Sequence, residues 1–371
     1  MTSGFFRRAI ADLVPYEPGK PVEEVQRELG LDRVVKLASN EGPYGPFPAA
    51  LAALEANARE LNRYPDGGAF RLRSALAELH DVRFEEVAAG AGADGVIDCL
   101  SQAVLEAGDE IVCGWPSFPS YVIDAIKLGA TPVRVPLRDH RYDLDALLDA
   151  ITERTKLVYI CLPNNPTCTT NTRAELDKYF AYVPSHVLTV LDQAYLEYID
   201  DPAYPDGITE YFKTGRRVFV LRTFSKIYGL AGLRVGYGVG DEALVIELAK
   251  VRRAFDVTSA GQVAALASLG EDDELRRRRE EVARERERVA IALERAGFSV
   301  ARPAVANFVY AETGDDGRFL FDALLREGVI VRPLAGFGAP SAIRVTVGTP
   351  EENGILEGAL ARVRSAVAAA K

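Results

Sequence analysis

The chain has 371 residues, of which 48% are hydrophobic and 26% are charged, and its formal net charge at pH 7 is −10. A chain of this length is expected to form one large domain and a smaller one, and its composition is ordinary for a soluble globular protein. The negative charge argues against a nucleic-acid partner and against binding to an anionic membrane surface.

The sequence carries no membrane, export or metal-binding signal. No segment reaches the ~18 consecutive apolar residues of a membrane-spanning helix, and the N-terminal MTSGFFRRAI has no long apolar core. The 4 cysteines have no metal-ligand spacing, and the 3 histidines are scattered. We therefore expect no metal site and interpret the cysteines as reduced thiols of a cytoplasmic protein.

The first part of the chain is predicted to be extended. Prolines recur between positions 15 and 48, so residues 1–39 are expected to form an irregular arm. Helices are predicted over 48–61 and 69–80, with the loop RYPDG at 63–67 between them. The expected domains are an N-terminal arm packing with the small domain, a large domain and a small C-terminal domain, at 1–40, 41–255 and 256–371.

A glycine-rich turn follows the first apolar run. Gly90, Gly92 and Gly95 form a G-x-G-x-x-G spacing before a helix, which is typical of a dinucleotide-binding loop. That loop requires an acidic residue after the next strand, whereas Asp109 and Glu110 precede it. Free amides at a helix N-terminus bind a phosphate group in either case. We predict a phosphate-binding turn and keep a nicotinamide-dependent oxidoreductase as a remote alternative.

Further apolar runs are predicted as buried strands at Ile111–Cys113, Leu157–Cys161, Val187–Leu191 and Val218–Leu221. Each is followed by a residue that can contact a ligand: Phe118, Asn165, Asp192 and Lys226. In an open α/β sheet, ligands bind just outside the carboxyl ends of the strands. The sequence therefore predicts an α/β fold in which these residues surround one ligand.

Lys226 lies directly after a buried strand, among hydroxyl and aromatic residues. Removal from water lowers the pKa of an amine there, which makes Lys226 a candidate for forming a Schiff base with a carbonyl compound. Arg234 follows eight residues later with a planar guanidinium suited to a phosphate. Thr223 and Ser225 add hydroxyl groups.

Beyond residue 240 the chain is predicted to be mainly helical. The expected helices are 241–254, 261–296, 317–327 and 351–369, and the expected strands are Asn307–Ala311, Val329–Arg332 and Ile343–Val347. This alternation indicates a small α/β domain. The run Arg276–Arg279 lies among acidic and basic residues at helical spacing, which is typical of a solvated helix face.

The segment TFSKIYGLAGLRVGY at 223–237 resembles the lysine segment of the fold-type I, pyridoxal-phosphate-dependent aminotransferases. Within that group it is most similar to the histidinol-phosphate aminotransferases and their aromatic amino acid aminotransferase relatives. The resemblance extends to LASNE at 37–41, RYPDG at 63–67 and NNPT at 164–167, and thus spans nearly the whole chain. It implies a large domain with a mostly parallel central sheet flanked by helices, and a smaller α/β domain.

The resemblance also implies how pyridoxal 5′-phosphate is held. Lys226 would carry the cofactor covalently, and its phosphate would lie between the turn and the residues after the strand, namely Gly92, Ala93, Asp94, Thr223, Ser225 and Arg234. Phe118 would stack on the pyridine ring, while Asn165 and Tyr195 would contact its 3′ oxygen. Asp192 would keep the pyridine nitrogen protonated by direct charge pairing, which lets the cofactor accept electrons.

Further residues are implied to reach the substrate or a second subunit. Tyr64 would touch the cofactor phosphate of the neighbouring subunit, which implies a homodimer. Tyr16 and Asn40 would face the substrate. Arg344 would clamp a substrate carboxylate in a bidentate fork, and Arg332 would help to hold a phosphate or another acidic group.

Four residues depart from the family pattern: Leu162, Cys168, Gln193 and Asp256. Leu162 replaces an asparagine, Cys168 a glycine and Gln193 a glutamate. Asp256 stands where relatives carry asparagine. Its carboxylate would either favour a basic substrate side chain or cap a helix over 258–270.

The predicted activity is an aminotransferase of amino-acid biosynthesis, as in histidine biosynthesis. It would move an amino group between histidinol phosphate or an aromatic amino acid and a 2-oxo acid such as 2-oxoglutarate. Lys226 would act as the general base, and a domain or loop would close over the substrate. The alternatives are a pyridoxal-phosphate decarboxylase or lyase, a specialised biosynthetic aminotransferase, and a binding protein that kept the fold.

Overall fold

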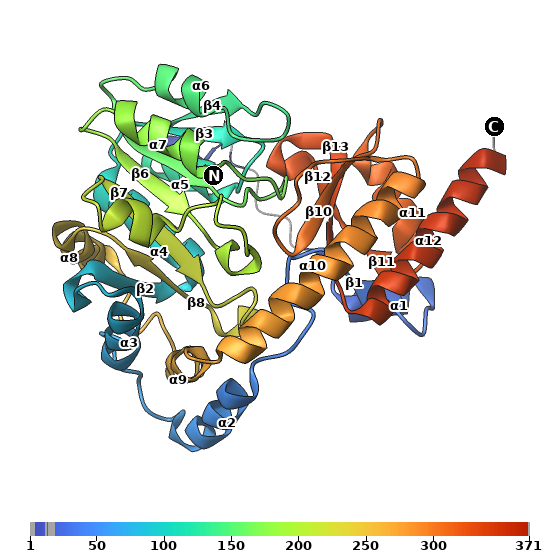
Figure 1. The fold of residues 1–371 in the computed structure, drawn as a ribbon, viewed down its shortest axis with the longest axis horizontal. Helices are drawn as coiled ribbons and strands as arrows, with labels where there is room; N and C mark the ends of the chain where they lie inside the picture. Colours follow the sequence, from blue (N-terminus) through green and yellow to red (C-terminus); the bar gives the residue numbers. More distant parts are fainter. Residues whose placement is uncertain (1–3, 12, 14–18, 370–371) are drawn as a thin grey trace.

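The computed structural model describes residues 4–11, 13 and 19–369, and Figure 1 shows a larger and a smaller part. The larger part is built on a seven-stranded sheet with the strand order β2-β8-β7-β6-β5-β3-β4. Only β8 runs against its neighbours, so the other strands share one direction. The strands are β2 (Val87–Ala91), β3 (Glu110–Trp115), β4 (Thr131–Pro136), β5 (Thr155–Cys161), β6 (Leu188–Asp192), β7 (Val218–Thr223) and β8 (Val235–Val239).

The central strands are buried on both faces, as their nearly continuous apolar sequences require. The helices that flank the sheet are α3 (Phe70–His80), α4 (Gly92–Val104), α5 (Ser120–Leu128), α6 (Leu144–Asp149), α7 (Arg173–Tyr182) and α8 (Glu242–Val251). Local signals set where they begin; α7, for example, starts at a capping box in which the Thr172 and Glu175 side chains bond to each other's backbone amides. The predicted α/β fold with a mostly parallel sheet is confirmed.

The smaller part contains a four-stranded antiparallel sheet in the order β12-β13-β10-β9. Its elements are β9 (Ser299–Val300), β10 (Phe308–Glu312), α11 (Gly317–Arg326), β12 (Arg332–Leu334), β13 (Ala339–Thr346) and α12 (Pro350–Ala369). The short strand β1 (Val35–Lys36) pairs in parallel with β11 (Val329–Ile330), which ties the N-terminal segment to this part. The domain limits 1–40, 41–255 and 256–371 remain a prediction.

The prediction that residues 1–39 are irregular was wrong. Besides β1, this segment forms the helix α1 (Val22–Leu29), which buries Val25. The proline that argued against a helix, Pro21, is the residue just before it, where a missing backbone N–H costs nothing. Gly30 ends the helix in the left-handed conformation, with a φ of 65°.

The long helix predicted over 261–296 is two helices. α9 (Ser259–Ser268) and α10 (Asp272–Arg295) are separated at Gly270, which has a φ of +86°. α9 packs on α3 and on α2 (Pro48–Asn57), so the chain changes direction before α10 leaves for the smaller part (Figure 1). The residue that caps α9 is Thr258, whose Oγ1 accepts from the Gly261 amide at 3.0 Å, and not Asp256.

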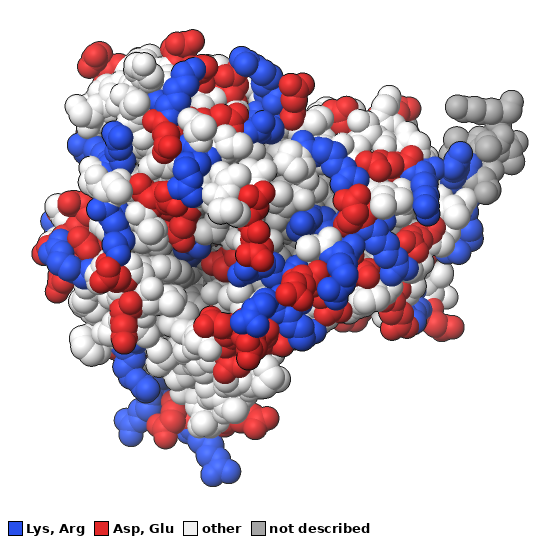
Figure 2. Space-filling view, viewed as in Figure 1, with Lys and Arg blue, Asp and Glu red and all other residues white. Residues whose placement is uncertain are grey.

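The arginine run on α10 is only partly a solvated face. Figure 2 shows Lys and Arg alternating with Asp and Glu along the band that α10 occupies in Figure 1. The side chains of Arg276 and Arg277 are 60% and 50% exposed. Arg278, in contrast, is 4% exposed and faces the larger part, so the prediction was wrong for this residue.

Among the helices of the described residues, none combines the length and the apolar character that crossing a membrane requires.

Candidate active site

The carboxyl ends of β2, β3, β5, β6 and β7 open onto one cavity of about 180 Å³, because these strands run in the same direction. The smaller part closes its other side with Arg344 and Phe337, and the N-terminal segment adds Ser39 and Asn40. The sequence-predicted residues that line it are Asn40, Ala93, Asp94, Phe118, Asn165, Asp192, Tyr195, Thr223, Ser225, Lys226, Arg234 and Arg344. Gly92 is the first residue of α4 and directly precedes the lining residues Ala93 and Asp94.

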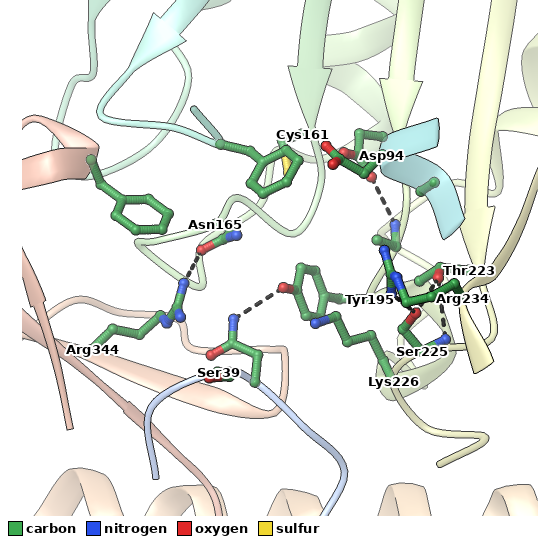
Figure 3. A pocket seen from close by; sticks show the side chains of 16 residues that line it. Ser39, Asp94, Cys161, Asn165, Tyr195, Thr223, Ser225, Lys226, Arg234 and Arg344 are labelled. Carbon is green, nitrogen blue, oxygen red and sulfur yellow. Dashed lines mark hydrogen bonds between the residues drawn. The ribbon is translucent and has the colours of Figure 1, made fainter. Parts of the chain in front are cut away.

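Hydroxyl and guanidinium groups gather at one end of the cavity, beside the first turn of α4 (Figure 3). The Thr223 hydroxyl donates to Ser225 Oγ at 3.0 Å, and Arg234 Nη1 donates to the same oxygen at 3.3 Å. The backbone amides of a first helical turn have no partner within the helix. Together with these side chains they make a site for an anion such as a phosphate.

Gly92 is required for this arrangement. Its φ of +77° belongs to the left-handed region, and a Cβ at this position would lie 2.6 Å from Arg234 Nη2. The absence of a side chain therefore lets the guanidinium approach the helix N-terminus.

Lys226 lies between this anion site and the Arg344–Asn165 pair in Figure 3. Burial lowers the pKa of its amine to about 8, and the positive charges of Arg344 and Arg234 act in the same direction. The Lys226 ammonium is 5.3 Å from the centre of the Tyr195 ring. An amine with this pKa is largely neutral slightly above pH 8 and can attack a carbonyl carbon.

Asp192 is a buried carboxylate at the end of β6. Burial raises its pKa, while hydrogen bonds from the Tyr121 hydroxyl and the Ala194 amide oppose that rise. The distances are 2.5 Å from Tyr121 to Oδ2 and 3.1 Å from Ala194 to Oδ1. Tyr121 is fully buried and stacks on Tyr159, with 4.3 Å between the ring centres. A carboxylate held in this way can pair with a protonated ring nitrogen.

Sequence analysis missed Tyr121, although a signal was present. It lies three residues after Phe118, in the first turn of α5, and the two rings contact each other edge to face with 5.6 Å between their centres. It also missed Cys161 and Phe337, which line the cavity. Neither is marked by a polar motif: Cys161 is the last residue of an apolar strand, and Phe337 is an apolar residue of the short turn after β12.

The larger part, the smaller part and the N-terminal segment meet at Arg344. This β13 residue donates to Asn165 Oδ1 and, at 2.8 Å through Nη2, to the Ala38 carbonyl. Asn40 Nδ2 donates to the Tyr195 hydroxyl at 3.0 Å. The cavity is therefore held together by hydrogen bonds between elements that are far apart in the chain (Figure 3).

Arg332 occupies the register position opposite Arg344, on the neighbouring strand β12. The Phe337 ring lies 5.6 Å from the Arg332 guanidinium carbon and 5.3 Å from that of Arg344. Arg344 and Phe337 thus line the cavity, and Arg332 lies beside both of them.

Four of the predicted site residues that the structure describes do not line the cavity: Gly92, Tyr64, Asp256 and Arg332. Tyr64 is 83% exposed and stacks on Phe255 at 4.7 Å. Asp256 forms an ion pair with Arg252, with 3.3 Å between Asp256 Oδ1 and Arg252 Nε. Tyr16 falls outside the described residues.

Two of the departures have structural explanations. Gln193 donates to the Pro205 carbonyl and accepts from the Gly207 amide, both at 2.9 Å. An amide can do both, whereas an ionised glutamate can only accept. Cys168 has a φ of 66° and is fully buried, and its thiol accepts from the Ala306 amide at 3.1 Å. Its position does not give it access to the cavity.

The groups around the cavity fit pyridoxal phosphate. The anion site suits its phosphate, the Phe118 ring its apolar face, Asp192 its ring nitrogen and Lys226 its aldehyde. The space at Gly92 that a Cβ would fill, beside the Arg234 guanidinium and the first turn of α4, is the feature that fits a phosphate group.

Comparisons with known proteins agree with this arrangement. The family model "Aminotransferase class I and II" matches residues 32–360. The histidinol-phosphate aminotransferase of Moorella thermoacetica is 43% identical over 94% of this chain and 90% of its own length. That of an Anaeromyxobacter species is 44% identical over 96% of this chain and 98% of its own.

Solved structures extend the comparison to the fold. The crystal structure of histidinol-phosphate aminotransferase from Sinorhizobium meliloti in complex with pyridoxal-5′-phosphate has a TM-score of 0.89, with 29% identity, and covers 99% of each chain. An aspartate aminotransferase double mutant of Thermus thermophilus has a TM-score of 0.83 at 25% identity, covering 97% of this chain and 99% of its own. The chain therefore belongs to the class I and II aminotransferases and is a pyridoxal-phosphate-dependent transaminase of fold type I.

Proposed function

We propose that the protein transfers the amino group of histidinol phosphate to a 2-oxo acid such as 2-oxoglutarate. The observation that carries the proposal is the pair of arginines on neighbouring strands, of which Arg344 lines the cavity and Arg332 lies opposite it in register, with the cavity-lining Phe337 beside both. Two cations there suit the phosphate of the donor and the carboxylates of the acceptor in turn. The names of relatives that are 42–44% identical support the same donor.

Lys226 and the residues around it have separate roles in the reaction. Pyridoxal phosphate, when bound, supplies an electron-accepting ring that stabilises the charge left when the substrate carbon loses its proton. Lys226 Nζ takes that proton and returns it, which its lowered pKa favours. Asp192 holds a positive charge at the ring nitrogen by charge pairing.

The other site residues hold and orient the cofactor and the substrate. In this proposal Asn165 and Tyr195 bind the 3′ oxygen, Phe118 stacks on the ring, and the phosphate is bound by Gly92, Ala93, Asp94, Thr223, Ser225 and Arg234. Asn40 and Tyr16 line the substrate side with Arg332 and Arg344. The ion pair of Asp256 with Arg252 gives no support to a substrate role for Asp256.

A homodimer is part of the same proposal. Tyr64 is 83% exposed and stacks on the partly exposed Phe255, so that its hydroxyl would be accessible to a second subunit. A cytoplasmic location and the domain limits likewise remain proposals.

Aromatic amino acids are the second candidate donors. Phe118 and Phe337 line the cavity, and two aromatic rings suit a planar side chain, whether imidazole or phenyl. The carboxylate of such a donor would be bound by Arg344.

The experiment is a donor comparison with the cofactor-loaded protein and 2-oxoglutarate, in which glutamate and carbon dioxide are both measured. We expect glutamate, with kcat/KM for histidinol phosphate at least about tenfold above that for phenylalanine, because only the former offers a phosphate to the arginines. A preference for phenylalanine would move the assignment to aromatic amino acids. Carbon dioxide release without glutamate would replace the transaminase proposal by the decarboxylase.

A further inference from the structure

Two arginines on α10 donate to the backbone of loops that carry active-site residues. Arg278 Nη1 donates to the Ile227 carbonyl at 3.1 Å, and Ile227 directly follows Lys226. Arg279 Nε donates to the Glu197 carbonyl at 2.8 Å, two residues after Tyr195. The same helix packs on β9, β10 and α12 of the smaller part. α10 therefore connects the smaller part to the lysine loop of the larger one (Figure 1).

The guanidinium of Arg278 is fixed from several sides. It is 4% exposed, its Nε donates to Glu274 Oε1 at 2.7 Å, and its carbon lies 4.4 Å from the centre of the Phe47 ring. A buried cation is tolerated only where it is paired and hydrogen-bonded. Because Nε of the planar guanidinium binds Glu274, the Nη1 group donates in a fixed direction, to the Ile227 carbonyl.

The loop after Lys226 is enclosed on its other side by the N-terminal segment. A tight turn joins the Lys226 carbonyl to the Gly229 amide at 3.0 Å. A Cβ on Gly42 would lie 2.8 Å from the Lys226 oxygen, and a Cβ on Gly229 would overlap the Gly45 carbonyl. The segment 42–45 thus contacts one side of the turn, and Arg278 holds the carbonyl of Ile227.

We propose that Arg278 is a positioning residue for Lys226. By holding the Ile227 carbonyl, it fixes the backbone from which the lysine side chain enters the cavity. The inference rests on the proposed role of Lys226 as the group that moves the proton. A displacement of about 1 Å at a reacting group can cost on the order of 100-fold in rate.

This role differs from an effect of charge on the lysine. The lowered pKa of Lys226 comes first from burial and then from Arg344. Arg278 acts through a hydrogen bond to the backbone. A variant that loses this bond should therefore keep the pH at which the rate changes and lower the rate at every pH.

The chain offers a matched control for the test. Arg276 is on the same helix with its side chain 60% exposed, and it pairs with Asp273 at 3.1 Å. Arg278→Met leaves no carboxylate unpaired, because Arg277 still binds both oxygens of Glu274 at 2.8 Å. Arg278→Lys keeps the charge and loses the planar fork.

Arg278→Met, Arg278→Lys and Arg276→Met are compared with the wild type as cofactor-loaded full chains, with histidinol phosphate as donor. We expect kcat of Arg278→Met to fall on the order of 10- to 100-fold, with KM within about threefold and the pH profile unshifted. Arg278→Lys should lie between Arg278→Met and the wild type. Arg276→Met should behave as the wild type.

Hydrogen exchange of the cofactor-free proteins gives a readout that does not depend on turnover. We expect faster exchange in the peptide 224–230 of Arg278→Met, with β6 and β10 unchanged. Wild-type kcat and exchange in this variant would overturn the inference. Faster exchange across the whole smaller part would also overturn it, since that would mean a general loss of packing.

Two further outcomes remain decisive. If Arg278→Met does not fold, the same measurements on Arg278→Lys decide, and a wild-type kcat with wild-type exchange at 224–230 would overturn the inference. If the wild-type protein forms no glutamate from any donor, the proposed function fails. If it forms glutamate and Arg278→Met does so equally well, only the role of Arg278 fails.

Discussion

At the scale of single residues, the contact between Tyr121 and Asp192 links packing to chemistry. The hydroxyl donates to a carboxylate whose pKa burial has raised, and thereby favours its charged form. The stacked Tyr159 fixes the Tyr121 ring, so the hydroxyl has one direction in which to donate. The charge of Asp192 therefore depends on an aromatic pair that is not part of the cavity lining.

Tyr121→Phe should weaken the function of Asp192. Loss of a hydrogen bond to a charged group, worth about 1.5–3 kcal/mol, raises the pKa of Asp192 further and lowers kcat roughly 10-fold or more. The measurement is kcat together with the pH dependence of the visible absorbance of the cofactor-loaded protein. Tyr159→Phe is the control, because the Tyr159 hydroxyl forms a hydrogen bond with Ser101 Oγ, at 3.4 Å, and not with Asp192. Equal effects of the two substitutions would contradict the role of Tyr121.

The pKa of Lys226 predicts how the cofactor-free protein takes up pyridoxal phosphate. Only the neutral amine attacks the aldehyde, and burial lowers the Lys226 pKa to about 8 from its ordinary value of 10.5. The rate of covalent uptake should therefore rise with pH up to about 8 and then level off. Stopped-flow absorbance measures this rate, and a rise that continues to pH 10 would show an unperturbed lysine.

At the scale of elements, the start of α4 shows how a strand, a glycine and an arginine make an anion site. β2 ends at Ala91, Gly92 turns the chain with a positive φ, and Arg234 approaches from the position directly before the adjacent strand β8. The contact is possible only because β2 and β8 are neighbours in the sheet.

Gly92→Ala should damage this site. The new Cβ would lie 2.6 Å from Arg234 Nη2 in a backbone conformation unfavourable for alanine, which costs about 1–3 kcal/mol. We expect weaker binding of pyridoxal phosphate and a lower free energy of unfolding, measured by cofactor titration and urea denaturation. Gly232→Ala is the control, since a Cβ there meets nothing within 4 Å. Unchanged cofactor affinity in Gly92→Ala would contradict the importance of the cradle.

Much of the sheet, and many of the residues that line the cavity, could be predicted from the sequence, because both depend on local signals. Buried parallel strands are continuous apolar runs, and the residues after them carry the polar groups. Arg278 and Tyr121 could not be predicted in this way, because their partners Ile227 and Asp192 are distant in sequence. The break at Gly270 was missed although the glycine and the acidic residues that follow it mark the end of one helix and the start of the next.

At the scale of the whole molecule, the cavity is completed by parts that are far apart in sequence. Arg344 of the smaller part donates to Asn165 of the larger part and to Ala38 of the N-terminal segment. A movement of the smaller part relative to the larger would thus open or close the substrate side of the cavity. In the proposed homodimer, Tyr64 of a second chain would complete the site.

The proposed homodimer predicts complementation between two defective variants. Lys226→Ala and Tyr64→Ala chains should each have low activity, whereas a mixture that exchanges subunits contains one site with both residues intact. Activity of the mixture should then exceed the sum of the separate variants. The wild type should also sediment at twice the 40.4 kDa of one chain. A monomer, or a mixture without recovered activity, would contradict the contribution of Tyr64 across subunits.

The most direct measurement is the absorbance spectrum of the protein with pyridoxal phosphate, recorded before and after histidinol phosphate is added. A covalent bond to Lys226 predicts a visible band that the donor removes and that 2-oxoglutarate then restores. Lys226→Ala should lack this band. A wild-type protein without the band, or a band that persists unchanged in Lys226→Ala, would contradict the central claim that Lys226 carries the cofactor through an amino-transfer cycle.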